Sequence, residues 1–229
     1  MGAIIKASLA PPSADASLAQ RLHLAAMGNT MDSLGPPLLC NQAALPEAPD
    51  VDACRGIMAR FAMPGHIRAH SERVTQVAVF VAERAREAGM DVCVRSVQAS
   101  ALLHDIAKDY AIRHGGHHAQ LGGAWTVEAT GNPTVAQGVM HHVFWPWDVD
   151  IDRGFLPLTV IYADKRVRHQ SVVSVADRYD DLFDRYGATP DIRARIQVTM
   201  NQALDIEQQL GNRLGIDLHA CTFDSGRLV

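Results

Sequence analysis

A chain of 229 residues is long enough to bury one sizeable core, or to form one domain with an appendage. The composition, 48% apolar and 20% charged, is ordinary for a folded globular protein. The formal net charge of −4 excludes a polyelectrolyte and gives no reason to expect a nucleic-acid-binding surface.

Residues 1–50 differ from the rest of the chain because they contain six of its 11 prolines, which break regular structure. A short helix is predicted from about Asp15 to Met27, with Leu18 and Leu22 on one face. The remainder of this segment is predicted to be an irregular N-terminal arm. We expect the arm to pack on the main domain or to mediate contacts in a homodimer.

The rest of the chain, residues 51–229, has a helical pattern and no convincing strand, which predicts an all-α fold. The clearest helix covers about 66–88, where apolar residues such as Val77 and Val81 recur at helical spacing and Gly89 ends the run. Helices are expected at about 51–61, 66–88, 92–109, 118 onward, 133–142, 156–169, 172–186 and 190–211, and loops at 113–118 and 144–154.

The most informative element is the doublet His104-Asp105, which ends the apolar helical run Ala101-Leu-Leu-His-Asp-Ile-Ala-Lys108. Burying polar side chains costs free energy unless they are hydrogen-bonded, charge-paired or bound to a metal. An imidazole next to a carboxylate makes a mixed nitrogen and oxygen site, which suits Fe, Mn, Co, Ni or Zn. The doublet therefore predicts a metal centre, and with it hydrolysis or oxygen chemistry.

Four more polar residues fall on apolar helix faces on either side of the doublet: His70, His118, His142 and Asp164. Convergence of all six side chains would provide ligands for one divalent metal ion, or for two with Asp105 as the bridge. A water between two such ions would become hydroxide near neutral pH, because the cations lower its pKa.

Two of these histidines have a histidine as their neighbour, which leaves alternatives open. The spacing to apolar residues of the same helix favours His118 over His117, and His142 over His141. His117 and His141 would then contact the ligands without binding the metal, or lie at the surface. Either member of each pair stays a candidate ligand.

The order of these residues resembles that of the HD-domain metal-dependent phosphohydrolases. Four residues carry the pattern: His70, His104, Asp105 and Asp164. The likeness extends over about residues 60–190. It implies an all-α HD-type helical bundle within 51–229, with these four residues as metal ligands and with hydrolysis of phosphoesters, often those of nucleotides, as the activity.

His118 and His142 are similar to the extra ligands of the HD subgroup that binds two metals. That subgroup includes bacterial diadenosine tetraphosphate hydrolases and cyclic-di-GMP phosphodiesterases. The Gly-Tyr-Pro element of the phosphodiesterases is replaced after His142 by Val-Phe-Trp-Pro-Trp. Enzymes that hydrolyse guanosine alarmones carry Glu-Asp after the doublet, where this chain has Lys108-Asp109. The closest pattern is that of small bacterial HD hydrolases of the diadenosine tetraphosphatase type.

Three cations near the predicted ligands are candidates for contact with a substrate. Lys108, one turn beyond His104, either contacts a phosphate in catalysis or is a favourable charge at a helix end. Arg73, one turn beyond the first ligand, either contacts a phosphate or pairs with a carboxylate. Lys165, next to Asp164, belongs either to an anion-binding rim or to a solvated charged face.

The sequence therefore predicts a cytoplasmic metal-dependent phosphohydrolase, with Asp105 and Lys108 in catalysis and a nucleotide or another small phosphoester as substrate. One or two divalent ions (Fe, Mn, Co, Ni or Zn) would be its cofactor. The cytoplasm is expected because no Cys-x-x-Cys pair is present and the first residues lack an apolar run for secretion or membrane insertion. Two alternatives are a di-iron oxygenase of the same fold and a nucleotide-binding regulator without turnover.

Overall fold

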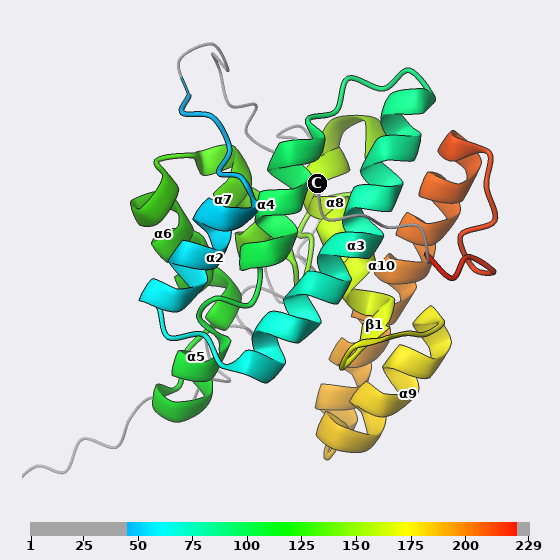
Figure 1. Cartoon of the computed structure of the whole chain (residues 1–229). Helices are drawn as coiled ribbons and strands as arrows, with labels where there is room; N and C mark the ends of the chain where they lie inside the picture. The colour runs from blue at the N-terminus through cyan, green and yellow to red at the C-terminus, as the bar shows by residue number, and fades with distance from the viewer. Residues whose placement is uncertain (1–44, 224–229) are drawn as a thin grey trace, which may run out of the picture. The chain divides into compact units, whose positions relative to one another are not determined.

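The computed structural model describes residues 45–223, and the regular structure in this range is almost entirely helical (Figure 1). The helices are α2 (Val51–Arg60), α3 (Gly65–Glu87), α4 (Val94–Leu103), α5 (Lys108–His114), α6 (His118–Thr130), α7 (Pro133–His141), α8 (Ile151–Lys165), α9 (Val175–Tyr186) and α10 (Pro190–Leu214). Two short strands, β1 (Val167–Arg168) and β2 (Ser171–Val172), form an antiparallel hairpin that the sequence did not predict. The all-α fold class is confirmed. None of the helices in this range is both long and apolar enough to cross a membrane.

The predicted N-terminal arm lies almost wholly outside the described residues, and so does the helix predicted over 15–27. The described part of the arm has no regular structure before α2 begins at Val51. Asn132 holds this segment, because its side-chain Nδ2 donates a hydrogen bond to the Pro46 carbonyl at 2.6 Å. The boundary between arm and domain at residue 50 stays a prediction.

Side-chain caps determine where several of these helices begin. Asp50 caps α2 by accepting a hydrogen bond from the Ala53 backbone N–H at 2.8 Å. The caps of α7, α8, α9 and α10 are Asn132, Asp150, Ser174 and Thr189. At the other end of α3, Gly89 has a φ of 79°, a left-handed conformation that stops the helix within two residues of its predicted end.

Helices α3, α4 and α8 lie in the middle of the described residues, between α2, α6 and α7 on one side and α9 and α10 on the other (Figure 1). Helix α4 packs into both sides. Its Val97 and Ala101 belong to the apolar cluster built around α3, α8 and α10, whereas Ala99 and Leu102 belong to the cluster shared with α2 and α7. The end of α4, where the His-Asp doublet begins, therefore lies where the two clusters meet.

Gly138 allows α7 to approach α4 closely. A Cβ atom at this position would lie 2.7 Å from Ser100 Cβ and 2.6 Å from Leu156 Cδ2, well inside van der Waals distance. Ser100 Oγ also donates a hydrogen bond to the Val135 carbonyl at 2.9 Å across the same contact. The spacing of the two helices that lead into the doublet and into His142 therefore depends on a residue without a side chain.

We expect Gly138→Ala to lower the free energy of unfolding by about 1–3 kcal/mol, because overpacking forces neighbouring side chains and backbone to shift. Urea denaturation of the variant and the wild type measures this difference. Gly56→Ala in α2 is the matched control, since nothing lies within 4 Å of a Cβ there and alanine favours a helix. Equal stability of Gly138→Ala and wild type would contradict the close packing of α4 on α7.

The helix predicted over 92–109 is wrong, because the chain forms two helices separated by a turn over residues 104–107, and the second one runs to His114, into the loop predicted over 113–118. The turn is tight, with the Lys108 backbone N–H donating to the Asp105 carbonyl at 3.0 Å. Consecutive residues of a continuous α-helix point about 100° apart. His104 itself keeps a helical backbone (φ −54°, ψ −37°), and the chain leaves the α-helix after it, with the side chains of His104 and Asp105 both in the cluster.

Helix α8 also differs from its predicted range of 156–169. It begins earlier, at Ile151, because Asp150 accepts hydrogen bonds from two backbone N–H groups of the first turn. It ends earlier, at Lys165, and the chain then enters the β1–β2 hairpin. His169 lies in the turn of that hairpin with a left-handed φ of 57°. The hairpin brings the His169 carbonyl to α3, where it accepts a hydrogen bond from Nδ1 of His70, the first predicted ligand.

Candidate metal centre

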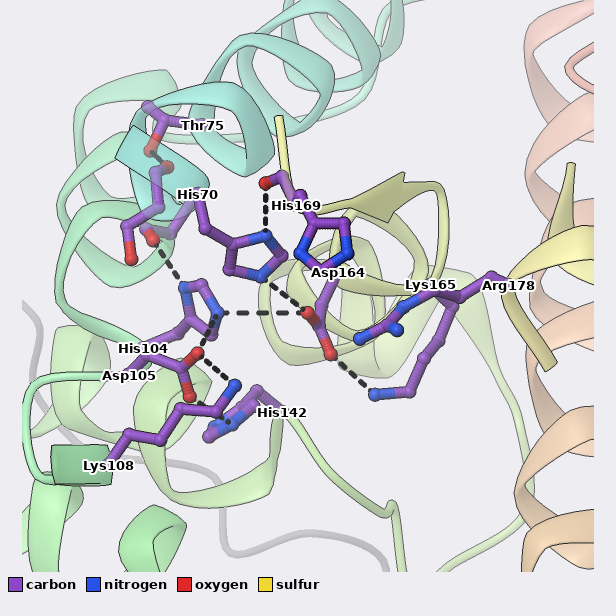
Figure 2. Close-up of polar contacts among 12 residues, drawn as sticks. His70, Thr75, His104, Asp105, Lys108, His142, Asp164, Lys165, His169 and Arg178 are labelled. Atoms are coloured by element: carbon purple, nitrogen blue, oxygen red, sulfur yellow. Dashed lines mark hydrogen bonds and ion pairs between the residues drawn. The ribbon is translucent and has the colours of Figure 1, made fainter. Parts of the chain in front are cut away.

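The six polar side chains predicted to converge lie together near the ends of their helices, and Figure 2 shows five of them, all except His118. They come from α3, the turn after α4, the start of α6, the end of α7 and the end of α8: His70, His104, Asp105, His118, His142 and Asp164. Each places a ring nitrogen or carboxylate oxygen within 3.5 Å of another member. All are buried except His118, which is partly exposed.

His104 and His142 are oriented by the same local hydrogen bond. Each follows the last residue of its helix, and its Nδ1 donates to the carbonyl three residues earlier: Ala101 for His104 at 2.8 Å, and Val139 for His142 at 2.7 Å. A carbonyl only accepts, so Nδ1 carries the proton in both rings. Nε2 then keeps its lone pair and faces the cluster, as a metal ligand requires.

His70 is oriented in the same way, but by the hairpin. Its Nδ1 donates to the His169 carbonyl at 2.9 Å, and its Nε2 lies 3.1 Å from Asp164 Oδ1. The same carboxylate oxygen lies 3.8 Å from His104 Nε2. His70, His104 and Asp164 thus form one group of buried donor atoms, all within 4.8 Å of one another.

Asp105 joins this group to a second one. Its Oδ2 lies 3.4 Å from His104 Nε2, whereas its Oδ1 lies 3.5 Å from the Nε2 atoms of both His118 and His142. The two latter nitrogens are 3.1 Å apart. His104, Asp105 and His142 form the second group of donors within 4.8 Å. A carboxylate whose two oxygens face different imidazoles is well placed to be shared by two cations.

Two atoms at the centre of the cluster lack a hydrogen-bond partner among the described residues: His104 Nε2 and Asp105 Oδ1. A buried polar atom left without a partner costs about 1–3 kcal/mol, and coordination to a metal removes that cost. Imidazole and carboxylate donors together suit Mn, Fe, Co, Ni or Zn. The residues therefore fit a divalent transition metal, and the two overlapping groups offer donors for one ion or two.

Two lysines contact the carboxylates. Lys108 Nζ lies 2.6 Å from Asp105 Oδ2, and Lys165 Nζ lies 2.5 Å from Asp164 Oδ2 (Figure 2). Burial alone would raise the pKa values of both carboxyl groups, but the neighbouring imidazoles and lysines outweigh it and hold these pKa values well below the usual range. Both carboxylates are therefore ionised at neutral pH and available as ligands.

The imidazoles divide into two kinds by their pKa. Burial and the charge of His142 lower the pKa of His118 to about 3, and burial also lowers the pKa of His142. For His104, burial alone would lower the pKa, but Asp105 and Asp164 outweigh it and raise the pKa. His118 and His142 are therefore neutral, with free lone pairs, whereas the position between the two carboxylates favours a positive charge.

The structure separates the members of the two histidine pairs. His117 is exposed and precedes α6, whereas His118 faces the cluster. His141 packs its ring edge-on against Trp145, with ring centroids 5.3 Å apart, whereas His142 faces the cluster. Among the described residues, His118 and His142 are the members with Nε2 at the cluster. Their role as ligands stays a prediction.

Sequence reasoning missed two residues beside the cluster, Arg178 and His169. Arg178 lies in α9 and extends toward Asp164 and Lys165, and His169 supplies the carbonyl that orients the ring of His70 (Figure 2). A sequence signal for Arg178 was present, since it stands between Val175 and Leu182 at the helical spacing of the apolar positions of α9.

The remaining predicted substrate-binding residue, Arg73, lies in α3. Its Nη1 donates a hydrogen bond to Gln76 Oε1 at 2.6 Å, in the next turn of the same helix. The partner in this contact is a side-chain amide, so the pairing of Arg73 with a carboxylate stays a prediction. Contact of Arg73 with a substrate stays a prediction.

Comparison with known protein families supports the geometry. A sequence model of the HD domain matches residues 67–182, which are 116 of the 229 residues and just over half of the chain. The matched range contains all six residues of the cluster. The chain therefore belongs to the HD-domain superfamily of metal-dependent phosphohydrolases, as its sequence predicts. Searches of curated proteins and of solved structures gave no match.

Proposed function

We propose that this protein is a metal-dependent phosphohydrolase that acts on a small phosphoester, with a nucleotide as the favoured substrate class. The observation that carries the proposal is the pair of unpartnered buried atoms, His104 Nε2 and Asp105 Oδ1, where two groups of metal donors overlap. The lysines beside this position are suited to receive a phosphate. Membership of the HD superfamily supports hydrolysis as the reaction.

In this proposal the predicted ligand residues bind the metal ion, and the lysines contact the phosphate of the substrate. A divalent ion bound there would lower the pKa of a coordinated water and so supply hydroxide near neutral pH. Asp105 would be shared between the donor groups. Burial alone would lower the pKa of Lys108, but Asp105 and Asp164 outweigh it and raise the pKa, so the amine is charged at neutral pH. Its side chain is 35% exposed, so this charge can reach a bound phosphoryl group from the rim.

The likeness to the diadenosine tetraphosphatase type makes dinucleoside polyphosphates the first substrates to test, followed by mononucleotides. The absence of Gly-Tyr-Pro after His142 argues against cyclic-di-GMP. We propose a cytoplasmic location for this activity, with Mn, Fe, Co, Ni or Zn as the ion. A homodimer contact through the N-terminal arm stays a prediction.

The function is tested by measuring the metal content of the purified protein, then phosphate release from mononucleotides and nucleotide release from dinucleoside polyphosphates, in the presence of Mn²⁺ and without oxygen. We expect hydrolysis products under these anaerobic conditions, because hydrolysis consumes only water. Product formation that requires oxygen would instead indicate a di-iron oxygenase. Tight nucleotide binding without product release would indicate a regulator, and either result would overturn the proposal.

Lys108→Ala is expected to slow phosphate release by about 10²–10³-fold, equivalent to about 2.7–4 kcal/mol, because it removes a donor aimed at the phosphoryl oxygens. The metal content should stay at the wild-type level, since Lys108 contacts Asp105 Oδ2 through a charged amine, which has no lone pair to offer as a ligand. Arg113→Ala is the control, because this exposed cation of α5 pairs only with Asp109 among the contacts found here. Undiminished activity of Lys108→Ala would return Lys108 to the role of a helix-end charge.

A further inference from the structure

Arg178 is a buried cation that the proposed reaction does not yet use. Its side chain is 10% exposed, and one guanidinium nitrogen, Nη1, donates to Asp181 Oδ2 at 3.0 Å within α9. Its Nε is buried and has no hydrogen-bond partner among the described residues. A buried charged group with an unused donor is costly, so its partner is expected to be a molecule that the protein binds.

The guanidinium of Arg178 lies beside the metal centre rather than in the apolar core. Figure 2 shows it extending from α9 toward Asp164 and Lys165, on the side of the cluster away from Asp105. The Arg178 guanidinium therefore faces the end of the centre that Asp164 and Lys165 form (Figure 2).

The charges around the centre indicate the charge of the ligand that it would bind. Leaving aside the exposed Arg185, which also contacts Asp181, three carboxylates and three cations balance one another before any metal is bound: Asp105, Asp164, Asp181, Lys108, Lys165 and Arg178. Each divalent ion held by neutral imidazoles and these carboxylates adds two positive charges. The loaded centre then has an excess of positive charge, which a phosphate anion would neutralise.

We propose that Arg178 binds a phosphoryl oxygen of the substrate through its free Nε–H, and so forms the wall of the phosphate site opposite Lys108. A planar guanidinium presents parallel N–H donors that match the oxygens of phosphate, and charge-assisted hydrogen bonds of this kind are the strong ones. Asp181 fixes the orientation of the guanidinium by holding Nη1. This assignment rests on the proposed function, because it makes Arg178 a substrate-binding residue of the same centre.

The test is a calorimetric titration of the Mn²⁺-loaded full chain with inorganic phosphate, the product of the proposed reaction. We expect Arg178→Met to weaken phosphate binding about 10- to 100-fold, the effect of losing one charge-assisted hydrogen bond. The manganese content and the melting temperature should be close to those of the wild type. Methionine keeps an apolar stem of similar length, and Asp181 keeps Arg185 as a partner.

Arg185→Gln is the matched control. Arg185 lies in the same helix and contacts the same Asp181 oxygen at 3.5 Å, but its side chain is 49% exposed. We expect phosphate binding within about twofold of the wild type in this variant, because exposed ion pairs contribute little. Arg178→Lys should bind phosphate more weakly than the wild type, since it keeps the charge but loses the planar donors. If Arg178→Met does not fold, the phosphate affinity of Arg178→Lys tests the role of Arg178 in its place.

The outcomes separate the two proposals. Wild-type phosphate affinity in folded Arg178→Met, or in Arg178→Lys if only that variant folds, overturns the role of Arg178. An absence of saturable phosphate binding in the wild type overturns it as well. If the wild type hydrolyses a nucleotide, Arg178→Met should also raise the KM. If no phosphoester is hydrolysed but phosphate binding depends on Arg178, the proposed function fails and the phosphate site stands.

Discussion

Asp105→Ala is expected to abolish phosphate release and to deplete the centre of metal, while the helices stay folded. The carboxylate connects both donor groups, with Oδ2 at 3.4 Å from His104 Nε2 and Oδ1 at 3.5 Å from the nitrogens of His118 and His142. Its loss removes a ligand common to both positions, and the hydroxide that hydrolysis needs depends on the cation. Elemental analysis and the phosphate assay on one preparation measure both effects.

Asp109→Ala provides the control for Asp105→Ala. Asp109 lies four residues later, at the start of α5, and pairs with Arg113 at 2.6 Å instead of facing the cluster. We expect wild-type metal content and activity in the control. Retention of full activity by Asp105→Ala would overturn the assigned chemistry, and loss of activity in both variants would point to a general effect on α5.

Arg166→Met is expected to lower the free energy of unfolding by about 3–5 kcal/mol, because removing one partner of a buried ion pair leaves the other charge uncompensated. Arg166 is 2% exposed, and its Nη1 contacts Glu207 Oε2 at 3.2 Å. The same guanidinium donates to the Val173 carbonyl at 2.7 Å and to the Cys221 carbonyl at 3.1 Å. It therefore joins α8, the hairpin, α10 and the C-terminal segment behind Asp164.

Thermal and urea denaturation of Arg166→Met give the size of this effect. Arg213→Met is the control, because Arg213 pairs with Asp152 at 3.2 Å between side chains that are 43% and 71% exposed. Such surface pairs contribute about 0–1 kcal/mol. Equal stability of the Arg166 and Arg213 variants would contradict the role of Arg166 as the connection behind α8.

The helices were predictable where the sequence alternates on a helical period and carries its own stop signal. The helix predicted over 66–88 is observed as Gly65–Glu87, because its apolar stripe and Gly89 are local features. The break over 104–107 was not predictable from the same pattern, since the apolar run continues through it. The break occurs where His104 and Asp105 contact residues of helices that are distant in the sequence. A local sequence pattern does not contain this information.

The candidate centre was predictable in its membership but not in its surroundings. His70 and Asp164 are 94 residues apart, yet each falls on an apolar helix face, so their burial follows from the pattern. Arg178 was missed because α9 reads Val-Ala-Asp-Arg-Tyr-Asp-Asp, a run of charges typical of a solvated face. Its burial results from the packing of α9 on α10 and α8, which the local sequence does not determine.

The most direct test of metal-dependent phosphoester hydrolysis is the transfer of ¹⁸O from labelled water into the released phosphate. The protein is stripped of metal with a chelator, divided, and one half is reloaded with Mn²⁺ before both halves receive the best substrate of the screen that releases inorganic phosphate. We predict labelled phosphate from the reloaded half and none from the stripped half, because the metal supplies the attacking hydroxide. Phosphate released at the same rate by both halves, or phosphate without the label, would contradict the assignment.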